Sequence, residues 1–111
     1  MPYLNVHLNK QLINQIEVAK KLSKLVSNEL NKQEKFVMVS IESDICMCFN
    51  GTEELTVFME LKSIGFPGDI KKISKSLCNF IKKELNINED RVYIVFSDVN
   101  RKMWSWNGET F

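Results

Sequence analysis

The residue of this 111-residue chain with the clearest chemical potential is Pro2, which directly follows Met1. Methionine aminopeptidase removes an initiator methionine when the next side chain is small, and proline qualifies. Processing would leave Pro2 as a secondary amine, a titratable group that an internal proline lacks. An ordinary α-amino group has a pKa of about 7.7–8.0, and an apolar pocket or a nearby cation lowers that pKa. Such an amine can serve as a general base near neutral pH.

A Met-Pro start alone indicates only efficient removal of methionine, so the context must decide between that interpretation and a catalytic one. The other reactive side chains are His7 and three cysteines, Cys46, Cys48 and Cys78. Cys46 and Cys48 are two residues apart, a spacing from which a disulfide does not easily close. No CxxC or HxxxH spacing is present. We therefore expect free thiols, no metal site and no cofactor.

The charge balance excludes two classes of partner. Fifteen basic and fourteen acidic residues give a formal net charge of +1. This near-neutral balance is not typical of proteins that bind nucleic acid or an anionic membrane surface. No apolar run is long enough to cross a bilayer. The sequence thus predicts a globular protein that binds neither nucleic acid nor membrane.

The hydrophobic spacing predicts the elements that must position Pro2. Residues 3–8 alternate apolar and polar side chains, as a half-buried strand does. From Leu12 to Leu30, apolar residues recur every three or four positions, which predicts an amphipathic helix. Residues 36–41, FVMVSI, are apolar and partly β-branched, and they predict a buried strand.

The second half of the chain repeats this order. Residues 55–63 alternate as a strand, and GFPGD then interrupts the pattern. Asp69 is expected to cap a second amphipathic helix from Ile70 to Leu85. Residues 91–96, RVYIVF, predict the closing strand. Segments 29–44 and 84–98 also align letter by letter with one gap, and both end in Ser-Asp.

This order predicts a single α+β domain over residues 1–111, built as a tandem βαβ pseudo-repeat. Its four-stranded sheet would carry both helices on one face. The other face would then lack a cover, and we expect its apolar residues to need a partner. Another copy of the chain is the simplest partner, so we expect the protein to oligomerise through its sheet.

Motifs along the whole chain resemble those of the macrophage migration inhibitory factor (MIF) and D-dopachrome tautomerase family, within the tautomerase superfamily. They are Met1-Pro2, KSIG at 62–65, SLC at 76–78, DRVYI at 90–94 and WNGETF at 106–111. The resemblance implies a homotrimer whose three sheets enclose a central channel. It also implies keto–enol tautomerisation of phenylpyruvate-type 2-oxo acids, with D-dopachrome as an artificial substrate and Pro2 as the base.

The resemblance also assigns substrate-binding roles. Lys32 matches the family's site lysine, which would hold the substrate's carboxylate or 2-oxygen and lower the pKa of the amine. Ile64 matches a position whose backbone amide meets the substrate oxygens, and Ser63 lies beside it.

The remaining assigned residues are mostly aromatic. Tyr93 matches a tyrosine that a neighbouring subunit supplies to the pocket mouth. Trp106 and Phe111 match the aromatic wall that would receive the ring of the substrate. Val95 stands where the family has an asparagine, which removes one polar contact to the substrate.

Three further positions depart from the family pattern. Phe36 replaces a tyrosine at the pocket edge, Trp104 stands where a smaller apolar residue is usual, and Lys62 replaces a histidine. The CxxC proposed for thiol chemistry in MIF reads Thr56-Val57-Phe58-Met59 here. This excludes a thiol-oxidoreductase role through that motif.

A second function stays open, that of a secreted cytokine-like protein that binds a host cell-surface receptor and keeps only an inherited pocket. Asp44 matches the aspartate of the receptor-binding pair ascribed to MIF, but Gln11 stands near the position of its arginine. The N-terminal residues lack the apolar core of a signal peptide. We therefore expect synthesis in the cytosol, with any secretion by a non-classical route.

Overall fold

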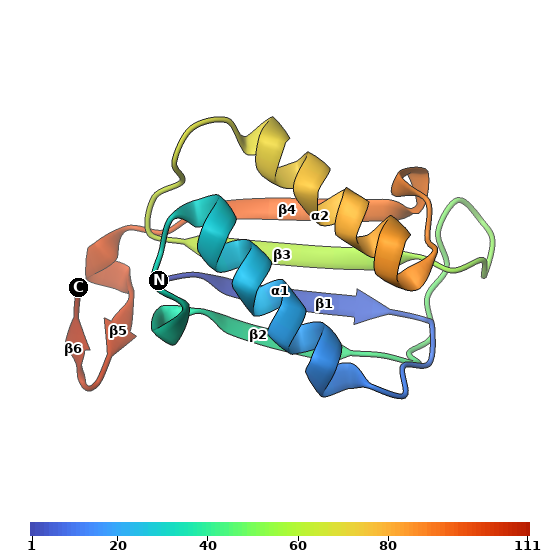
Figure 1. Cartoon of the computed structure of the whole chain (residues 1–111), viewed down its shortest axis with the longest axis horizontal. Helices are drawn as coiled ribbons and strands as arrows, with labels where there is room; N and C mark the ends of the chain where they lie inside the picture. The colour runs from blue at the N-terminus through green and yellow to red at the C-terminus, as the bar shows by residue number, and fades with distance from the viewer.

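A computed structural model describes residues 1–111 as a four-stranded sheet with both helices on one face (Figure 1). The elements are β1 (Tyr3–Leu8), α1 (Gln15–Leu30), β2 (Met38–Glu42), β3 (Val57–Ser63), α2 (Ile70–Leu85) and β4 (Val92–Asp98). The strand order is β2-β1-β3-β4. β1 is parallel to β2 and β3 to β4, whereas β1 and β3 are antiparallel. This arrangement confirms the predicted tandem βαβ fold.

The core lies between the sheet and the two helices. Alternate residues of β1 and β3 point toward the helices and are buried, namely Leu4, Val6, Leu8, Val57, Met59 and Leu61. The apolar stripes of the helices cover them, with Val18, Leu22, Val26 and Leu30 from α1 and Ile73, Leu77, Ile81 and Leu85 from α2. The apolar residues that alternate along the strands and those that recur along the helices therefore form one buried layer between the sheet and the helices.

The two halves end their helices in the same way. Each helix finishes at a leucine, and the following residues, Asn31 and Asn86, adopt left-handed backbone with φ of 52° and 57°. Asparagine tolerates this conformation better than most residues. Short 3₁₀ turns follow, η1 (Glu34–Phe36) and η2 (Glu89–Arg91), and each leads into a strand. The repeated letters thus encode a repeated structure.

Most helix and strand boundaries agree with those predicted from the sequence, and the few differences are local. Asp69 caps α2 as predicted, because its carboxylate accepts a hydrogen bond of 2.9 Å from the Lys71 amide. α1 begins at Gln15, while Leu12 is buried in the preceding loop. β2 begins at Met38, because the η1 turn takes up Phe36. β4 continues to Asp98, two residues beyond the predicted end of the closing strand at residue 96.

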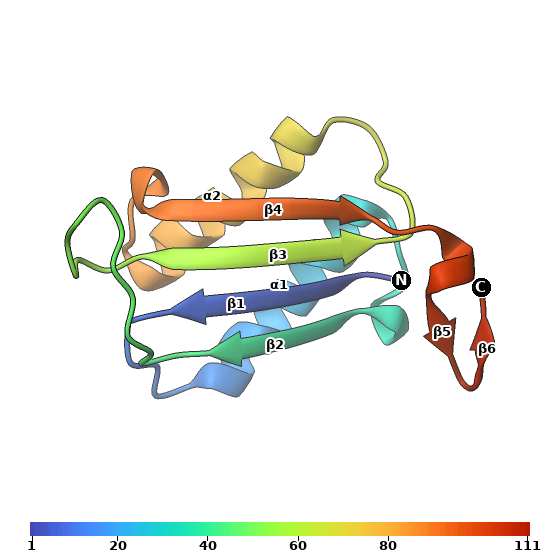
Figure 2. The ribbon, with the colours of Figure 1, turned by 180° about the vertical axis from the view of Figure 1, so that it is seen from behind.

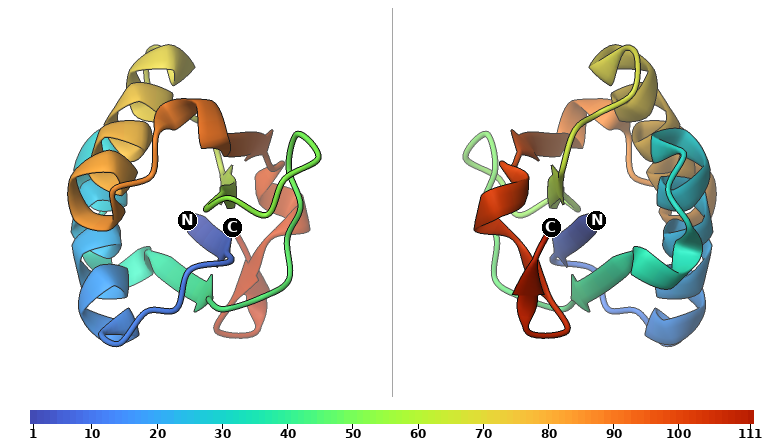
Figure 3. Two further views of the ribbon diagram at one scale, coloured as in Figure 1. Left: turned by 90° about the vertical axis from the view of Figure 1, so that its right-hand side faces the viewer. Right: turned by 90° about the vertical axis from the view of Figure 1, so that its left-hand side faces the viewer.

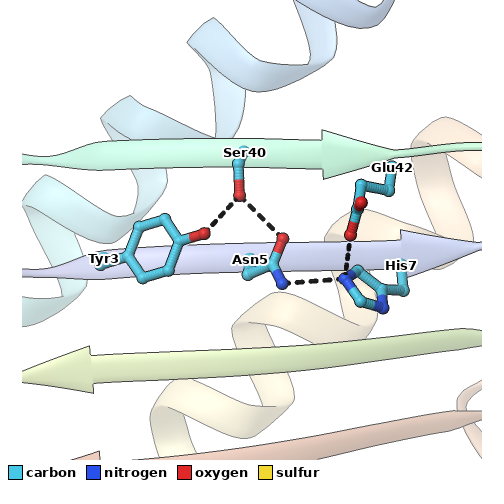
Figure 4. A network of polar contacts seen from close by, with 5 residues as sticks. All are labelled: Tyr3, Asn5, His7, Ser40 and Glu42. Atoms are coloured by element: carbon cyan, nitrogen blue, oxygen red, sulfur yellow. Dashed lines mark hydrogen bonds and ion pairs between the residues drawn. The ribbon is translucent and has the colours of Figure 1, made fainter.

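The sheet face opposite the helices is left uncovered within one chain (Figure 2). The centre of this face carries a polar network on β1 and β2 (Figure 4). In it, Ser40 donates to Asn5 Oδ1 at 2.7 Å and lies 2.7 Å from the Tyr3 hydroxyl. Asn5 also contacts His7, which pairs with Glu42. The alternation of β1 already places Tyr3, Asn5 and His7 on this face, and the cross-strand register brings Ser40 and Glu42 beside them.

A C-terminal hairpin extends the fold beyond the sheet. After the turn η3 (Arg101–Met103), strands β5 (Ser105–Trp106) and β6 (Glu109–Thr110) pair across Asn107-Gly108. Both turn residues have positive φ, 56° and 81°, as a two-residue hairpin turn requires. The hairpin lies beyond the end of the sheet at which β1 begins, on the side away from the helices (Figures 1 and 3). Neither helix has the length and hydropathy of a membrane span.

Candidate active site

Pro2 is buried at the start of β1, beside the C-terminal hairpin. Its carbonyl accepts a 3.0 Å hydrogen bond from the Met38 amide, which continues the β1–β2 pairing to this residue. Pro2 lines a pocket of about 670 Å³ between the sheet end and the hairpin. Other residues that line this pocket include Met1, Tyr3, Lys35, Phe36, Met38, Ser40, Lys62, Met103, Trp104 and Trp106. The pocket is large enough for a small-molecule ligand.

A second pocket of about 300 Å³ adjoins the first. It is lined by Met1, Asn31, Lys32, Gln33, Phe36, Ile64, Arg101 and Phe111. Met1 and Phe36 line both pockets, so these two residues form the boundary between them. Removal of Met1 would place the amine of Pro2 at that boundary, between an aromatic pocket and a cationic one.

Lys32 is held firmly at the end of α1. The left-handed Asn31 turns the chain, and the Lys32 amide then donates to the Ser27 carbonyl at 3.0 Å. The Ser27 hydroxyl in turn donates to the Lys32 carbonyl at 2.6 Å. From this fixed backbone, the Lys32 ammonium donates to the Ile64 carbonyl at 3.2 Å. Two of the predicted binding residues, Lys32 and Ile64, are therefore in direct contact.

The environment of the N-terminus lowers the pKa of an amino group placed there. The pKa of the Met1 amino group is lowered, first by burial and second by the positive charge of Lys32. Pro2 lies one residue further along the chain and is itself buried. An amine at Pro2 would therefore meet the same two influences, which are those that a general base at neutral pH requires.

The aromatic wall forms from three residues. Trp106 and Phe111 stack with ring centroids 6.3 Å apart and planes 10° from parallel. Phe36 meets Trp106 edge-on, with centroids 5.6 Å apart and planes at 87°. The hairpin turn brings Phe111 back, because its amide donates to the Trp104 carbonyl at 3.2 Å. These contacts place Trp106 and Phe111 together, one at each pocket.

Ser63 does not reach either pocket within this chain. Its side chain points toward the helices, is fully buried, and has a hydroxyl without a hydrogen-bond partner. Its carbonyl accepts from the Val99 amide at 2.8 Å, which joins the ends of β3 and β4. The predicted contact between Ser63 and the substrate thus stays a prediction, and the geometry gives this side chain a place in the core.

Tyr93 and Val95 lie far from Pro2 in the same chain. Both are on the open sheet face of β4, with 61% and 45% of their surface exposed. Tyr93 is opposite Phe58, which is opposite His7, five residues beyond Pro2 on β1. At about 3.3 Å per residue, that offset is about 17 Å along the sheet. Only a neighbouring subunit could bring Tyr93 to the pocket.

The three positions that depart from the family pattern, Phe36, Trp104 and Lys62, all line the large pocket. Several other residues that line the pockets were not predicted from the sequence, including Tyr3, Met38, Arg101 and Met103. Tyr3 and Met38 could have been found, because each follows the strand period on the face opposite the core. Arg101 and Met103 come from a short turn that no hydrophobic period marks.

Known proteins are similar to this chain in both sequence and fold. The family model described as macrophage migration inhibitory factor (MIF) matches residues 1–111. A homologue of that factor from Brugia malayi is 34% identical over 100% of this chain and 99% of its own length. The factor from Xenopus tropicalis is 36% identical over 81% of this chain and 80% of its own.

Solved structures agree with the sequence comparisons. The homologue from Prochlorococcus marinus superposes with a TM-score of 0.92 at 34% identity, covering 98% of each chain. The factor from Trichinella spiralis gives a TM-score of 0.92 at 29% identity, with 98% and 99% covered. The chain is therefore a member of the macrophage migration inhibitory factor family, within the tautomerase superfamily.

Proposed function

We propose that the chain, once Met1 is removed, is a keto–enol tautomerase that acts on phenylpyruvate-type 2-oxo acids, with Pro2 as its general base. D-dopachrome would be an artificial substrate of the same site. The observation that carries the proposal is the position of Pro2, buried at the meeting point of an aromatic pocket and a pocket that contains Lys32. Family membership supports the same reaction class.

The geometry suggests how each residue would act. The neutral Pro2 nitrogen would take a proton from the carbon next to the 2-oxo group, and the electron pair would form the enol double bond. The protonated amine would then deliver this proton to the 2-oxygen of the enolate, which completes the enol and restores the neutral amine. The Lys32 ammonium would hold the carboxylate and stabilise the charge that develops on the 2-oxygen. Trp106 and Phe111 would pack against the substrate ring.

The proposed active form is a homotrimer. Tyr93 and Val95 lie on the open sheet face, offset along the sheet from Pro2 of the same chain by about 17 Å and about 10 Å. Association through the sheet would bring these residues to the Pro2 pocket of a neighbouring subunit. It would also cover the exposed side chains of Tyr93, Val95 and Met38.

Replacement of Pro2 tests the proposal. In protein whose Met1 is removed, Pro2→Gly should lower kcat/KM for phenylpyruvate, because glycine leaves a flexible primary amine in place of the rigid proline nitrogen; the upper bound of the loss is the contribution of a general base, about 10²–10⁴-fold. The matched control is Pro67→Gly, because Pro67 is the only other proline and lies outside both pockets. Full activity of Pro2→Gly would refute a catalytic role for Pro2.

The receptor-binding alternative concerns another part of the surface. Asp44 is exposed in the loop after β2, and its amide donates to the Lys10 carbonyl at 3.0 Å, next to the exposed Gln11. These residues lie outside both pockets. A receptor ectodomain that binds Pro2→Gly as tightly as the unmodified protein would separate this role from catalysis.

A further inference from the structure

The charged side chains that line the two pockets are all cations. Lys35 and Lys62 line the large pocket, and Lys32 and Arg101 line the small one. This local excess contrasts with the whole chain, where fifteen basic residues nearly balance fourteen acidic ones. A concave surface with one sign of charge attracts ligands of the opposite sign. The positive charge exceeds what one carboxylate of a 2-oxo acid requires.

Lys32 and Arg101 both line the small pocket, which makes them the candidates for holding the carboxylate of the 2-oxo acid. Lys35 belongs to the exposed η1 turn, and its ammonium lies over the Phe36 ring, 5.1 Å from the ring centre. That cation–π contact already gives Lys35 a partner. Lys62 is therefore the cation of the large pocket that is left to meet a second anionic group.

Lys62 occupies a well-defined position in the sheet. It lies on β3 directly opposite Tyr3, the residue after Pro2, so the two Cα atoms are about 5 Å apart. The structure contains two ion pairs, His7–Glu42 and Lys21–Glu84, and neither includes Lys62. Glu60 lies two residues away on the same face without pairing to Lys62.

The neighbouring hydroxyl groups cannot take over the recognition of an anion. Ser40 uses its proton to donate to Asn5 Oδ1, so the Tyr3 hydroxyl must donate to Ser40 (Figure 4). Tyr3 then presents only acceptor lone pairs to the pocket, and these repel a carboxylate. On this side of the pocket, Lys62 is the donor that a carboxylate can use.

We propose that Lys62 makes the Pro2 site selective for dianionic 2-oxo acids, in which an apolar body separates the 2-oxo acid end from a second carboxylate. This inference rests on the proposed tautomerase function. Lys32 and Arg101 hold the 2-oxo acid end, and Lys62 holds the distal carboxylate. Phe36, Trp104 and Trp106 pack against the apolar body between them.

The experiment compares two pairs of ligands on the full-length protein without Met1. Phenylpyruvate and 4-carboxyphenylpyruvate report turnover, while cinnamate and 4-carboxycinnamate report binding without reaction, by calorimetry. We expect the dicarboxylate of each pair to show a KM or Kd about fivefold lower, the effect of one partly exposed ion pair. Lys62→Met should bring both ratios close to one, and Lys62→Arg should restore them. Lys71→Met, on α2 outside the pockets, is the matched control and should keep the preference.

The two proposals fail in different ways. Phenylpyruvate turnover without a preference for the dicarboxylate, or a preference that survives Lys62→Met, would overturn the role of Lys62 and leave the tautomerase function intact. No turnover of either 2-oxo acid would overturn the tautomerase function. In that case, a preference for 4-carboxycinnamate that Lys62→Met removes would still support the assigned anion site.

Discussion

Mixed trimers of two defective variants should recover activity, because Pro2 and Tyr93 would meet only across a subunit boundary. One variant, Pro2→Gly, replaces the proline base with a flexible primary amine of low expected activity, and the other, Tyr93→Ala, lacks the aromatic contact. Within one chain, the register of β1, β3 and β4 separates these residues by about five residue steps. Each complete site would thus need Pro2 from one chain and Tyr93 from its neighbour.

The expected recovery follows from this geometry. In trimers that assemble at random from equal amounts of the two chains, one half times one half, or about a quarter, of the sites have both residues. Burial of an aromatic side chain contributes roughly 1.5–3 kcal/mol, so Tyr93→Ala alone should lower kcat/KM about tenfold or more. An equal blend of the two separate homotrimers should then show only about a twentieth of full activity, and the mixed trimers about a quarter.

The assay is phenylpyruvate tautomerisation after the two variants are unfolded and refolded together, with native mass spectrometry to confirm mixed trimers. The control is the same two proteins refolded separately and then combined. If the mixed trimers are no more active than this blend, Tyr93 does not complete a neighbour's site, and the proposed division of the site is wrong.

Two further predictions concern Lys32 and Ser63. Burial and the charge of Lys32 lower the pKa of the Met1 amino group. If a free Pro2 amine in the same place meets these influences, kcat/KM should rise with pH and level off below the ordinary range of about 7.7–8.0. Lys32→Met should move this rise to higher pH, and an unchanged pH profile would contradict the influence of Lys32. Ser63→Ala should keep both activity and stability, because the buried hydroxyl has no hydrogen-bond partner to lose. A large increase in KM would instead show that Ser63 contacts the substrate.

The layered fold could be predicted from the sequence because its signals are local. The apolar stripe from Val18 to Leu30 and the alternation in residues 3–8 each fix which side of an element is buried. The C-terminal hairpin was not predicted, because strands of two residues are too short to show an alternation of apolar and polar residues. Asn107-Gly108 is a turn signal that could have indicated it. The polar network of the open face depends on register between distant strands, which no local pattern contains.

The candidate site was predicted in part. A free amine at Pro2 follows from elementary chemistry, but the match to the family motifs was needed to favour it over an ordinary chain start. The contact between Lys32 and Ile64 joins residues 32 positions apart, so only the folded chain shows it. Ser63 is buried because it continues the alternation of buried residues along β3, after Val57, Met59 and Leu61. That alternation was visible in the sequence and pointed Ser63 toward the core.

The most direct test of the central claim compares two preparations of the same chain, one with Met1 retained and one with Met1 removed, each verified by intact mass. Retained Met1 converts the Pro2 nitrogen into an amide, which has no basic lone pair. The preparation that begins at Pro2 should turn over phenylpyruvate, and the one that begins at Met1 should lose the contribution of a general base, about 10²–10⁴-fold. Equal turnover by both preparations would contradict the claim that the free Pro2 amine is the base.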